Sequence, residues 1–597
     1  MDPGHGGAGV TEDERVDEAR VAPPPREIAA RARHEWSRLV EHVRDPALPP
    51  TPQKRAWWAL HGVGMLFAVL FYTWSMTPSL LPRPWYLQGI ATGICVALGY
   101  GVGVLVASVV RRLGFSPEWS ERTRLWGWVA LAGLAAIELP LFMVLGARWQ
   151  ETTRELVGVQ EESGWFTVLL LPIAAGLALV LVALGRLFLR TGYRIARFVS
   201  RLVPVVLARL VGLVAALVIT VILLQDGVVA GILALGGRAA ATRDLEDPPG
   251  VVPPQVEEKS GSDASPVEWE HLGREGRAFV SGGPTAAEIE AFSGEPAITP
   301  IRVYAGLGSA PTIEEIAATV VDELDRTGAF DREVLAVATT TGTGWIDESM
   351  ARPLEYLHGG NTAIAGMQYS YLPSGFAFLA DRSTPKTAGQ ALFTAVYARW
   401  SMLPEDERPR LVVMGESLGS YGGGSAFSGV QDMVARTDGA LWVGTPNFAE
   451  PWGAITDTRD PGSPERLPVV DGGEHARFAD SSDDLVPDAS WDFPRIVYLQ
   501  HATDPVVWWS SDLLLRQPDW LREPRAETVN PAMSWYPFVT FWQVTVDLAF
   551  SVDVPDGYGH RYELANTDAW AAIVPPDGWT PQDTDDLREH LASQASE

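Results

Sequence analysis

The stretch RLVVMGESLGSYGGG, residues 410–424, decides the fold. An apolar run of strand type, Leu411–Met414, leads directly into Gly415-Glu416-Ser417-Leu418-Gly419, and a glycine-rich helical segment follows. In this G-x-S-x-G pattern a serine stands on a sharp turn from strand to helix, and a side chain two positions away on either side would clash with its neighbours. Ser417 is therefore the candidate nucleophile.

The surroundings of this turn alternate between short β-branched runs and amphipathic segments. Such alternation indicates βαβ units and a mostly parallel sheet with helices on both faces. Active sites of such sheets lie at the carboxyl ends of the strands. The expected strands are Ile301–Ala305, Val334–Thr339, Thr362–Met367, Arg410–Met414, Ala440–Val443 and Arg495–Gln500, and the expected helices include Thr312–Thr327, Thr387–Trp400 and Ser425–Thr437.

A serine nucleophile needs a base to take its proton and an acid to orient that base. In folds of this kind the chain order is serine, acid, histidine. Asp504 follows the last expected strand within a turn, and His560 stands on a later loop flanked by glycines. The sequence therefore predicts Ser417, Asp504 and His560 as the catalytic residues.

Other residues compete for these roles. His501, at the end of the last expected strand, is the main rival base; we interpret it as a structural histidine, because the base comes from a separate, later loop. His475 precedes the acid and is disfavoured. Asp553 and Asp556 are alternative acids, but they lie so close to His560 in sequence that we read them as solvated loop carboxylates.

The tetrahedral intermediate needs amide donors for its oxygen. We expect one donor to be the amide of Leu418, directly after the nucleophile, and the other to come from the loop after an early strand. Thr341, Gly342 and Thr343 follow the second expected strand and are the candidates.

The N-terminal half contains five apolar stretches long enough for a membrane crossing, which takes about 20 residues. Trp and Tyr at several of their ends are typical of interfacial anchors. The sequence thus predicts an all-α transmembrane bundle of about five helices. The stretches are Trp57–Met76, Tyr86–Val110, Leu125–Gly146, Trp165–Leu189 and Leu202–Leu224.

The charges of the loops predict the orientation. The second loop carries Arg111, Arg112, Arg122 and Arg124, whereas the first carries only Arg83. By the positive-inside rule the N-terminus is cytoplasmic, and five crossings place everything after residue 240 outside the cytoplasm. A re-entrant or interfacial helix among the five would reverse that conclusion. Glu138 within the third stretch is either a functional group or a carboxyl buried within the bundle.

Composition excludes some functions. The formal net charge of −28 argues against nucleic-acid binding, which requires Lys and Arg to neutralise phosphates. Cys95 is the only cysteine, so neither an internal disulfide nor a cysteine-based zinc site is possible. We expect no metal and no organic cofactor. The expected partners are membrane lipids and an acyl-ester substrate.

These patterns divide the chain into five parts. We expect a polar, partly disordered cytoplasmic N-terminus at 1–53, a transmembrane helical domain at 54–240, a proline-rich linker at 241–297, a catalytic domain at 298–580 and a charged tail at 581–597. An aromatic-rich stretch lies between the expected acid and base, and it fits either a core or an acyl-chain pocket and lid.

Several longer stretches resemble a bacterial, mainly actinobacterial, family of membrane α/β-hydrolases with an N-terminal transmembrane domain. The resemblance runs from the first apolar stretch to about Trp570 and implies an α/β-hydrolase fold with a serine nucleophile, but no substrate. His501 belongs to one of the shared stretches. The stretches are FVSGGPT at 279–285, TGTGW at 341–345, QYSYLP at 368–373, GESLGS at 415–420, YLQHATDP at 498–505 and Gly559-His560.

Together these features predict a membrane-anchored serine hydrolase that acts on an acyl ester or thioester of an envelope lipid or a lipophilic small molecule. An acyltransferase that uses the same acyl-enzyme is the alternative within enzymes. A non-catalytic membrane scaffold or transport component is the alternative of a different class.

Overall fold

The computed structural model describes residues 60–114, 119–160, 168–223, 230–486 and 490–595. These residues belong to two compact units. The described part of the smaller unit is Gly185–Ile222, and the larger unit takes in the described residues of Leu60–Leu184 and Leu223–Glu597. The predicted N-terminal segment at 1–53 lies outside the described residues.

Four helices in the described part of the chain are long and apolar enough to cross a membrane: α3 (Trp85–Arg112), α4 (Glu121–Leu156), α5 (Leu170–Val199) and α6 (Val205–Ile222). The first predicted crossing differs. Its described part forms α2 (Gly62–Ser75), which has 14 residues. At 1.5 Å per residue α2 spans about 21 Å, less than the ~30 Å of a bilayer core. The described helices thus supply four crossings by length, whereas the sequence predicts about five; Trp57–Ala59 lie outside the described residues.

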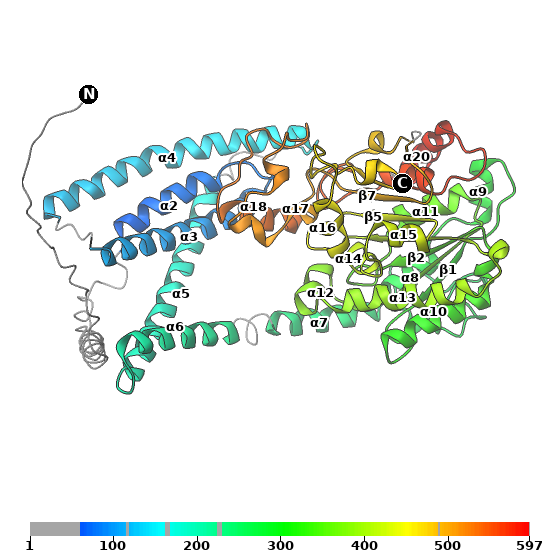
Figure 1. The fold of residues 1–597 in the computed structure, drawn as a ribbon, viewed down its shortest axis with the longest axis horizontal. Helices are drawn as coiled ribbons and strands as arrows, with labels where there is room; N and C mark the ends of the chain where they lie inside the picture. Colours follow the sequence, from blue (N-terminus) through cyan, green and yellow to red (C-terminus); the bar gives the residue numbers. More distant parts are fainter. Residues whose placement is uncertain (1–59, 115–118, 161–167, 224–229, 487–489, 596–597) are drawn as a thin grey trace, which may run out of the picture. The chain divides into compact units, whose positions relative to one another are not determined.

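The catalytic part is built on one seven-stranded sheet, as Figure 1 shows. All neighbouring strands pair in parallel, in the order β1-β3-β2-β4-β5-β7-β6. The predicted parallel sheet is therefore confirmed, and β6 is the one strand that the sequence did not predict. The strands are β1 (Ile301–Ala305), β2 (Val334–Thr339), β3 (Thr362–Met367), β4 (Arg410–Glu416), β5 (Gly439–Val443), β6 (Ala476–Ala479) and β7 (Arg495–Leu499).

Helices cover both faces of this sheet (Figure 1), as predicted. Successive side chains of a strand point to opposite faces, so Val337 of β2 joins one apolar cluster and Ala336 joins the other. Because both faces are covered, the strands are mostly apolar, with isolated charged residues such as Arg302 in β1, instead of alternating regularly with polar residues. α10 (Ile313–Thr327) and α13 (Thr384–Ser401) pack in the first cluster; α8 (Gly273–Ser281), α11 (Glu348–Leu357) and α19 (Ala565–Ile573) pack in the second.

The segments that flank the sheet in sequence also pack against it. Within the predicted linker, the amide of Ser260 donates a hydrogen bond to the carbonyl of Arg302 in β1 (3.1 Å), and Phe279 of α8 is buried. The predicted tail forms α20 (Pro581–Ala595), whose Leu587 is buried in the second cluster. Both segments therefore contribute apolar side chains to the core. α7 (Ala230–Asp244) and α9 (Ala286–Ser293) complete this region.

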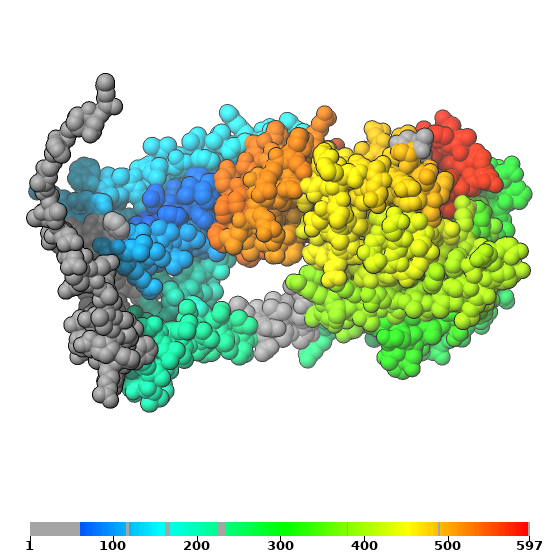
Figure 2. Space-filling model, in the orientation of Figure 1, coloured from blue at the N-terminus to red at the C-terminus, as the bar shows by residue number. Residues whose placement is uncertain are grey.

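The stretch between β7 and α19 joins the catalytic part to the membrane helices. Its helix α18 (Val539–Asp547) contacts α2 and α3, and Tyr536 just before it stacks on Trp74 with ring centroids 5.1 Å apart. The side-chain amide of Gln543 donates hydrogen bonds to the carbonyls of Ser75 (3.2 Å) and Thr77 (2.8 Å). In Figure 2 this stretch, drawn in orange, lies directly against the blue atoms of these helices. One side of α18 is therefore supported by the membrane helices.

Candidate active site

Ser417 stands on a strained turn between β4 and α14 (Leu418–Gly424). Its φ is 53°, a conformation that costs a non-glycine residue of order 1–3 kcal/mol and is kept where the surroundings enforce it. The amide of Ser417 donates to the carbonyl of Val443 in β5 (2.9 Å). A Cβ at Gly419 would lie 2.2 Å from the carbonyl oxygen of Thr339, so only glycine fits there. The predicted turn is thus present, with both pattern glycines tightly enclosed.

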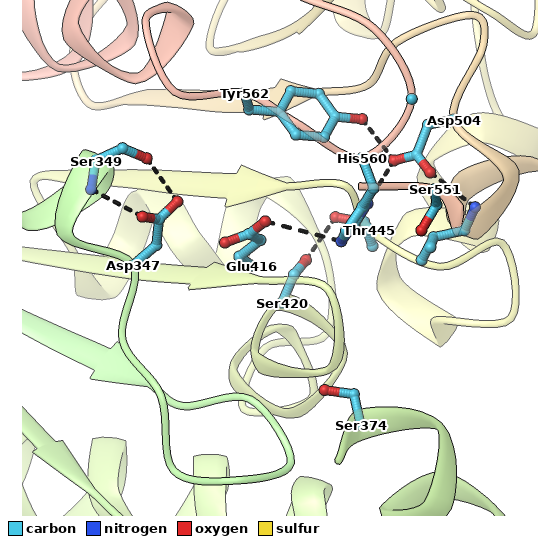
Figure 3. Close-up of polar contacts among 12 residues, drawn as sticks. Asp347, Ser349, Ser374, Glu416, Ser420, Thr445, Asp504, Ser551, His560 and Tyr562 are labelled. Atoms are coloured by element: carbon cyan, nitrogen blue, oxygen red, sulfur yellow. Dashed lines mark hydrogen bonds and ion pairs between the residues drawn. The ribbon is translucent and has the colours of Figure 1, made fainter. Parts of the chain in front are cut away.

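Asp504 and His560 meet beside this turn, although 56 positions separate them. Asp504 follows β7, and His560 lies on the loop before α19. The His560 Nδ1 and the Asp504 Oδ2 are 2.7 Å apart, and both residues are buried. Figure 3 shows the two side chains pointing toward one another. Gly444 gives the imidazole room, because a Cβ at this position would lie 2.3 Å from the His560 Cε1. The arrangement fits a histidine whose Nδ1–H is held by a carboxylate.

Two further donors hold the Asp504 carboxylate. The Tyr562 hydroxyl donates to Oδ2 and the Val506 amide donates to Oδ1, each at 2.7 Å. Burial, together with the charge of Asp504, raises the pKa of Tyr562 well above its usual value, so that hydroxyl keeps its proton and donates. Sequence reasoning missed Tyr562; its position two residues after His560 was the one available signal.

His501 contacts backbone and an aromatic ring. Its Nδ1 lies 3.0 Å from the carbonyl of Gly559, and its ring stacks on Tyr562 at 3.9 Å between centroids. Burial lowers the pKa of His501, which favours a neutral ring whose Nδ1–H donates to that carbonyl. His501 therefore stabilises the loop that carries His560.

The other rivals likewise have structural partners. The Asp556 carboxylate accepts hydrogen bonds from the amides of Glu563 (2.6 Å) and Leu564 (3.2 Å). The His475 ring lies beside the carbonyl of Pro494 (3.1 Å) at the start of β7. Both therefore stabilise backbone turns.

Ser417 and His560 line one pocket of about 710 Å³ at the carboxyl edge of the sheet. Thr341 and Leu418 also line it, whereas Gly342 and Thr343 are not among its lining residues. Its apolar walls include part of the aromatic stretch that follows Asp504. They comprise Phe378, Phe448, Val506, Trp509, Leu548 and Val552.

The amides of the 341–343 loop have partners of their own in this structure. The Thr341 amide donates to the carbonyl of Trp345 (3.0 Å), and the Gly342 amide donates to the hydroxyl of Ser374 (3.2 Å). Ser374 lines the pocket, so its hydroxyl hydrogen is a donor that the sequence reasoning missed. The oxyanion role of Leu418, Thr341, Gly342 and Thr343 stays a prediction.

Two carboxyl groups at the same edge were also missed. Glu416 is 8% exposed, and its Oε1 lies 3.8 Å from the His560 Nε2 (Figure 3). Burial raises the pKa of Glu416 well above its usual range, and the charges of Asp347 and Asp504 raise it further. The Asp347 carboxylate accepts from the amide (2.8 Å) and the hydroxyl (2.5 Å) of Ser349. The position of Glu416 next to the nucleophile was the signal that could have found it.

A parallel sheet, a serine on the turn after β4 and a histidine–aspartate pair from two later loops define an α/β-hydrolase. Across the described stretches of the chain, no group of three or more His, Cys, Asp or Glu is arranged to hold a metal ion. The chain belongs to the alpha/beta-hydrolase family: the family's model matches residues 301–587, and the model of the family's N-terminus matches residues 76–284. Searches of curated proteins and of solved structures find no match.

Proposed function

We propose that this protein is a membrane-associated serine hydrolase that cleaves an acyl ester or thioester through an acyl-enzyme on Ser417. The observation that carries the proposal is the 2.7 Å contact between the His560 Nδ1 and the Asp504 Oδ2 in a pocket that Ser417 also lines. Because the carboxylate holds the His560 Nδ1–H, Nε2 is the nitrogen that is available to take the proton of the Ser417 hydroxyl.

Acylation begins when the Ser417 hydroxyl attacks the carbonyl carbon and its proton passes to the His560 Nε2. Asp504 stabilises the imidazolium that forms. The negative oxygen of the tetrahedral intermediate takes hydrogen bonds from the Leu418 amide and from the loop opposite, where the Ser374 hydroxyl is a further donor. The bond to the alcohol then breaks, and Nε2 returns the proton to the departing oxygen.

Deacylation reverses these roles. Water gives a proton to the His560 Nε2 and attacks the acyl carbon; the serine oxygen then leaves and takes the proton back. Acid and free enzyme result, so the cycle consumes one water and needs no cofactor. Tyr562 supports both steps, because its hydroxyl donates a hydrogen bond to the Asp504 carboxylate and holds it in position.

The walls of the pocket support a long acyl chain as part of the substrate. Phe378 stacks on Phe448 (4.4 Å between centroids), and Phe448 meets Trp509 edge to face (6.2 Å), which makes a continuous aromatic wall. The Trp509 indole donates to the Thr545 hydroxyl of α18 (2.8 Å). A wall supported on membrane helices fits a substrate that partitions into lipid.

The test is ester hydrolysis by the full-length protein in detergent micelles. We expect kcat/KM on p-nitrophenyl esters to rise from acetyl to longer acyl chains, because each buried methylene contributes about 0.8 kcal/mol. Ser417→Ala should remove the activity, and Ser593→Ala, at an exposed serine of α20, should retain it. Equal activity of Ser417→Ala and wild type would contradict the proposal.

We also propose that the catalytic domain lies outside the cytoplasm. At the ends of α3 and α4 nearest the catalytic domain, Arg83, which precedes α3, contacts Asp547, and the hydroxyl of Thr153 in α4 accepts from the side-chain amide of Asn530 (2.9 Å). The opposite ends carry Arg111, Arg112, Arg122 and Arg124. The positive-inside rule assigns those arginine-bearing ends to the cytoplasm, and this argument does not depend on whether α2 crosses.

Labelling with a membrane-impermeant maleimide tests this orientation, since the native Cys95 is buried. Met402→Cys probes the catalytic domain and Leu113→Cys the end of α3, where the native residues are 78% and 70% exposed. In intact cells we expect the Met402→Cys variant to be labelled and the Leu113→Cys variant to be labelled only after lysis. The reverse pattern would place the catalytic domain in the cytoplasm.

A further inference from the structure

The catalytic pocket carries an acidic patch beside the histidine as well as its aromatic wall. Asp347, Glu416 and Glu563 all line the pocket, from three different elements of the chain. Figure 3 shows Glu416 between Asp347 and His560. The aromatic wall is a separate surface, since its rings contact one another and α18. The pocket thus offers two chemically different surfaces to one substrate.

Glu416 is the buried member of this acidic patch. Its residue is 8% exposed, and its Oε2 has no hydrogen-bond partner among the described residues. The His560 Nε2 likewise has no hydrogen-bond partner within the described parts of the chain. Since the His560 Nε2 lies 3.8 Å from the Glu416 Oε1, a polar group of the substrate placed here meets both the imidazole and the Glu416 carboxyl.

The geometry of the proposed reaction indicates which part of the substrate lies beside His560 and Glu416. The departing alcohol oxygen must come within about 3 Å of the His560 Nε2 to receive its proton. Because Nε2 lies 3.8 Å from the Glu416 carboxyl, the alcohol leaves against Glu416 and its acidic neighbours. The acyl chain then has the aromatic wall available to it.

The charges around this position disfavour an anionic alcohol. The pKa of Glu416 is already raised well above its usual range by burial and by its neighbours Asp347, Asp504 and Glu563, so a further negative charge would meet the same repulsion. Arg561 donates to the Glu563 carboxylate (Nε to Oε1, 3.1 Å) and offsets the charge of that group, so the repulsion comes mainly from Asp347 and Asp504. Arg382 lies over the Phe378 ring, 4.4 Å from its centroid, on the aromatic wall.

Hydrogen-bonding capacity favours hydroxyl groups at this position. Carboxylates accept hydrogen bonds, and a carboxyl that retains its proton both donates and accepts, so these groups complement a hydroxyl, which also does both. A phosphate offers only further acceptors and negative charge.

This proposal rests on the proposed hydrolase function: we propose that Asp347, Glu416 and Glu563 form the subsite for the alcohol part of the substrate, and that this alcohol is a polyol without negative charge, such as glycerol or a sugar. During acylation the bond between the acyl carbon and the polyol oxygen breaks, and that oxygen takes the proton from the His560 Nε2. The polyol leaves intact, and its remaining hydroxyls stay hydrogen-bonded to the carboxyl groups until release.

The test compares esters that share one oleoyl chain, using the full-length protein in mixed micelles. We expect kcat/KM for monooleoylglycerol to exceed that for oleoyl lysophosphatidic acid by at least about 100-fold. Glu416→Gln should lower kcat/KM for the glycerol ester by about 10-fold. Glu563→Lys, which also frees Arg561, should raise the relative rate on the phosphate ester at least about 10-fold.

Glu407→Lys is the matched control, because Glu407 is exposed and is not among the pocket's lining residues. It should leave the preference unchanged. Equal rates on the glycerol and phosphate esters by a wild-type protein that reacts with a fluorophosphonate would overturn the subsite while leaving the hydrolase intact. No reaction with the fluorophosphonate would instead overturn the proposed function itself.

Discussion

The Arg83 Nε lies 3.4 Å from the Asp547 Oδ1, and both side chains are fully buried. Arg83 precedes α3, and Asp547 ends α18, where the amide of Leu80 also donates to its Oδ2 (3.2 Å). The next residue, Leu548, lines the catalytic pocket. The segment between α2 and α3 therefore holds part of the pocket wall in place.

Removing one partner of this ion pair should destabilise the fold. Arg83→Met leaves Asp547 as an uncompensated buried charge, and we expect the free energy of unfolding to fall by about 3–5 kcal/mol. The double variant Arg83→Met/Asp547→Leu removes both charges and should recover most of that loss. The measurement is denaturant unfolding of the full-length protein in detergent. Arg112→Met, at the exposed far end of α3, is the control. A double variant no more stable than Arg83→Met would contradict the idea that the loss comes from an uncompensated charge on Asp547.

The same pair predicts a pH dependence of stability. Burial raises the pKa of Asp547 to about 6, above its value of about 4 in an unfolded chain. A raised folded-state pKa means that the contribution of Asp547 is complete below pH 4 and is lost as the pH rises through 6. A shift of two units corresponds to about 3 kcal/mol. The free energy of unfolding should decline less between pH 4.5 and 7 in Asp547→Asn than in the wild type. Equal declines in the two proteins would count against a raised pKa of Asp547.

Tyr562→Phe tests whether the Tyr562 hydroxyl supports Asp504, the proposed partner of the catalytic histidine. The hydroxyl donates to Asp504 and also accepts from the His501 amide (3.0 Å), so its loss removes a hydrogen bond to a charged group and leaves that amide unpaired. Such hydrogen bonds contribute about 1.5–3 kcal/mol, which corresponds to a 10- to 100-fold fall in kcat/KM. Steady-state kinetics on a p-nitrophenyl ester measure it, and an unchanged kcat/KM would exclude the role.

His501→Phe tests whether His501 or His560 is the catalytic base. Phenylalanine keeps the stacking on Tyr562 but loses the hydrogen bond to the Gly559 carbonyl, so we expect stability to fall by about 1–3 kcal/mol. Reaction with a fluorophosphonate should persist, because His501 contacts backbone and is not among the pocket's lining residues. Loss of that reaction in a folded His501→Phe protein would make His501 the base.

Much of the fold was predictable because its signals are local. Each of the six predicted strands occurs in the sheet, since a β-branched run between turn residues needs little further context. β6 was missed because Ala476–Ala479 contains Arg477 and is only four residues long. The end of the first apolar stretch was predicted to within one residue, since α2 ends at Ser75 and Met76 caps it, whereas its start was placed too early, because the helix begins only at Gly62 after the N-cap His61.

The site was predictable only where the order of residues along the chain carries the information. Ser417 has its pattern, and Asp504 and His560 follow from the order of elements, although their roles stay predictions. Glu416 and Tyr562 offer only their positions beside Ser417 and His560 as a signal, and Asp347 offers none. Their significance arises from burial and from contacts between residues about 60 or more positions apart, which the sequence does not display.

The most direct test of the central claim is reaction of the full-length protein with a fluorophosphonate probe. We expect the wild-type protein to be labelled, Ser417→Ala to be unlabelled and His560→Ala to react at least about 100-fold more slowly, because the serine then lacks its base. Ser593→Ala should label as the wild type does. Wild-type labelling that persists in Ser417→Ala, or a folded wild type that does not label in detergent, would contradict the assignment of Ser417 as the nucleophile.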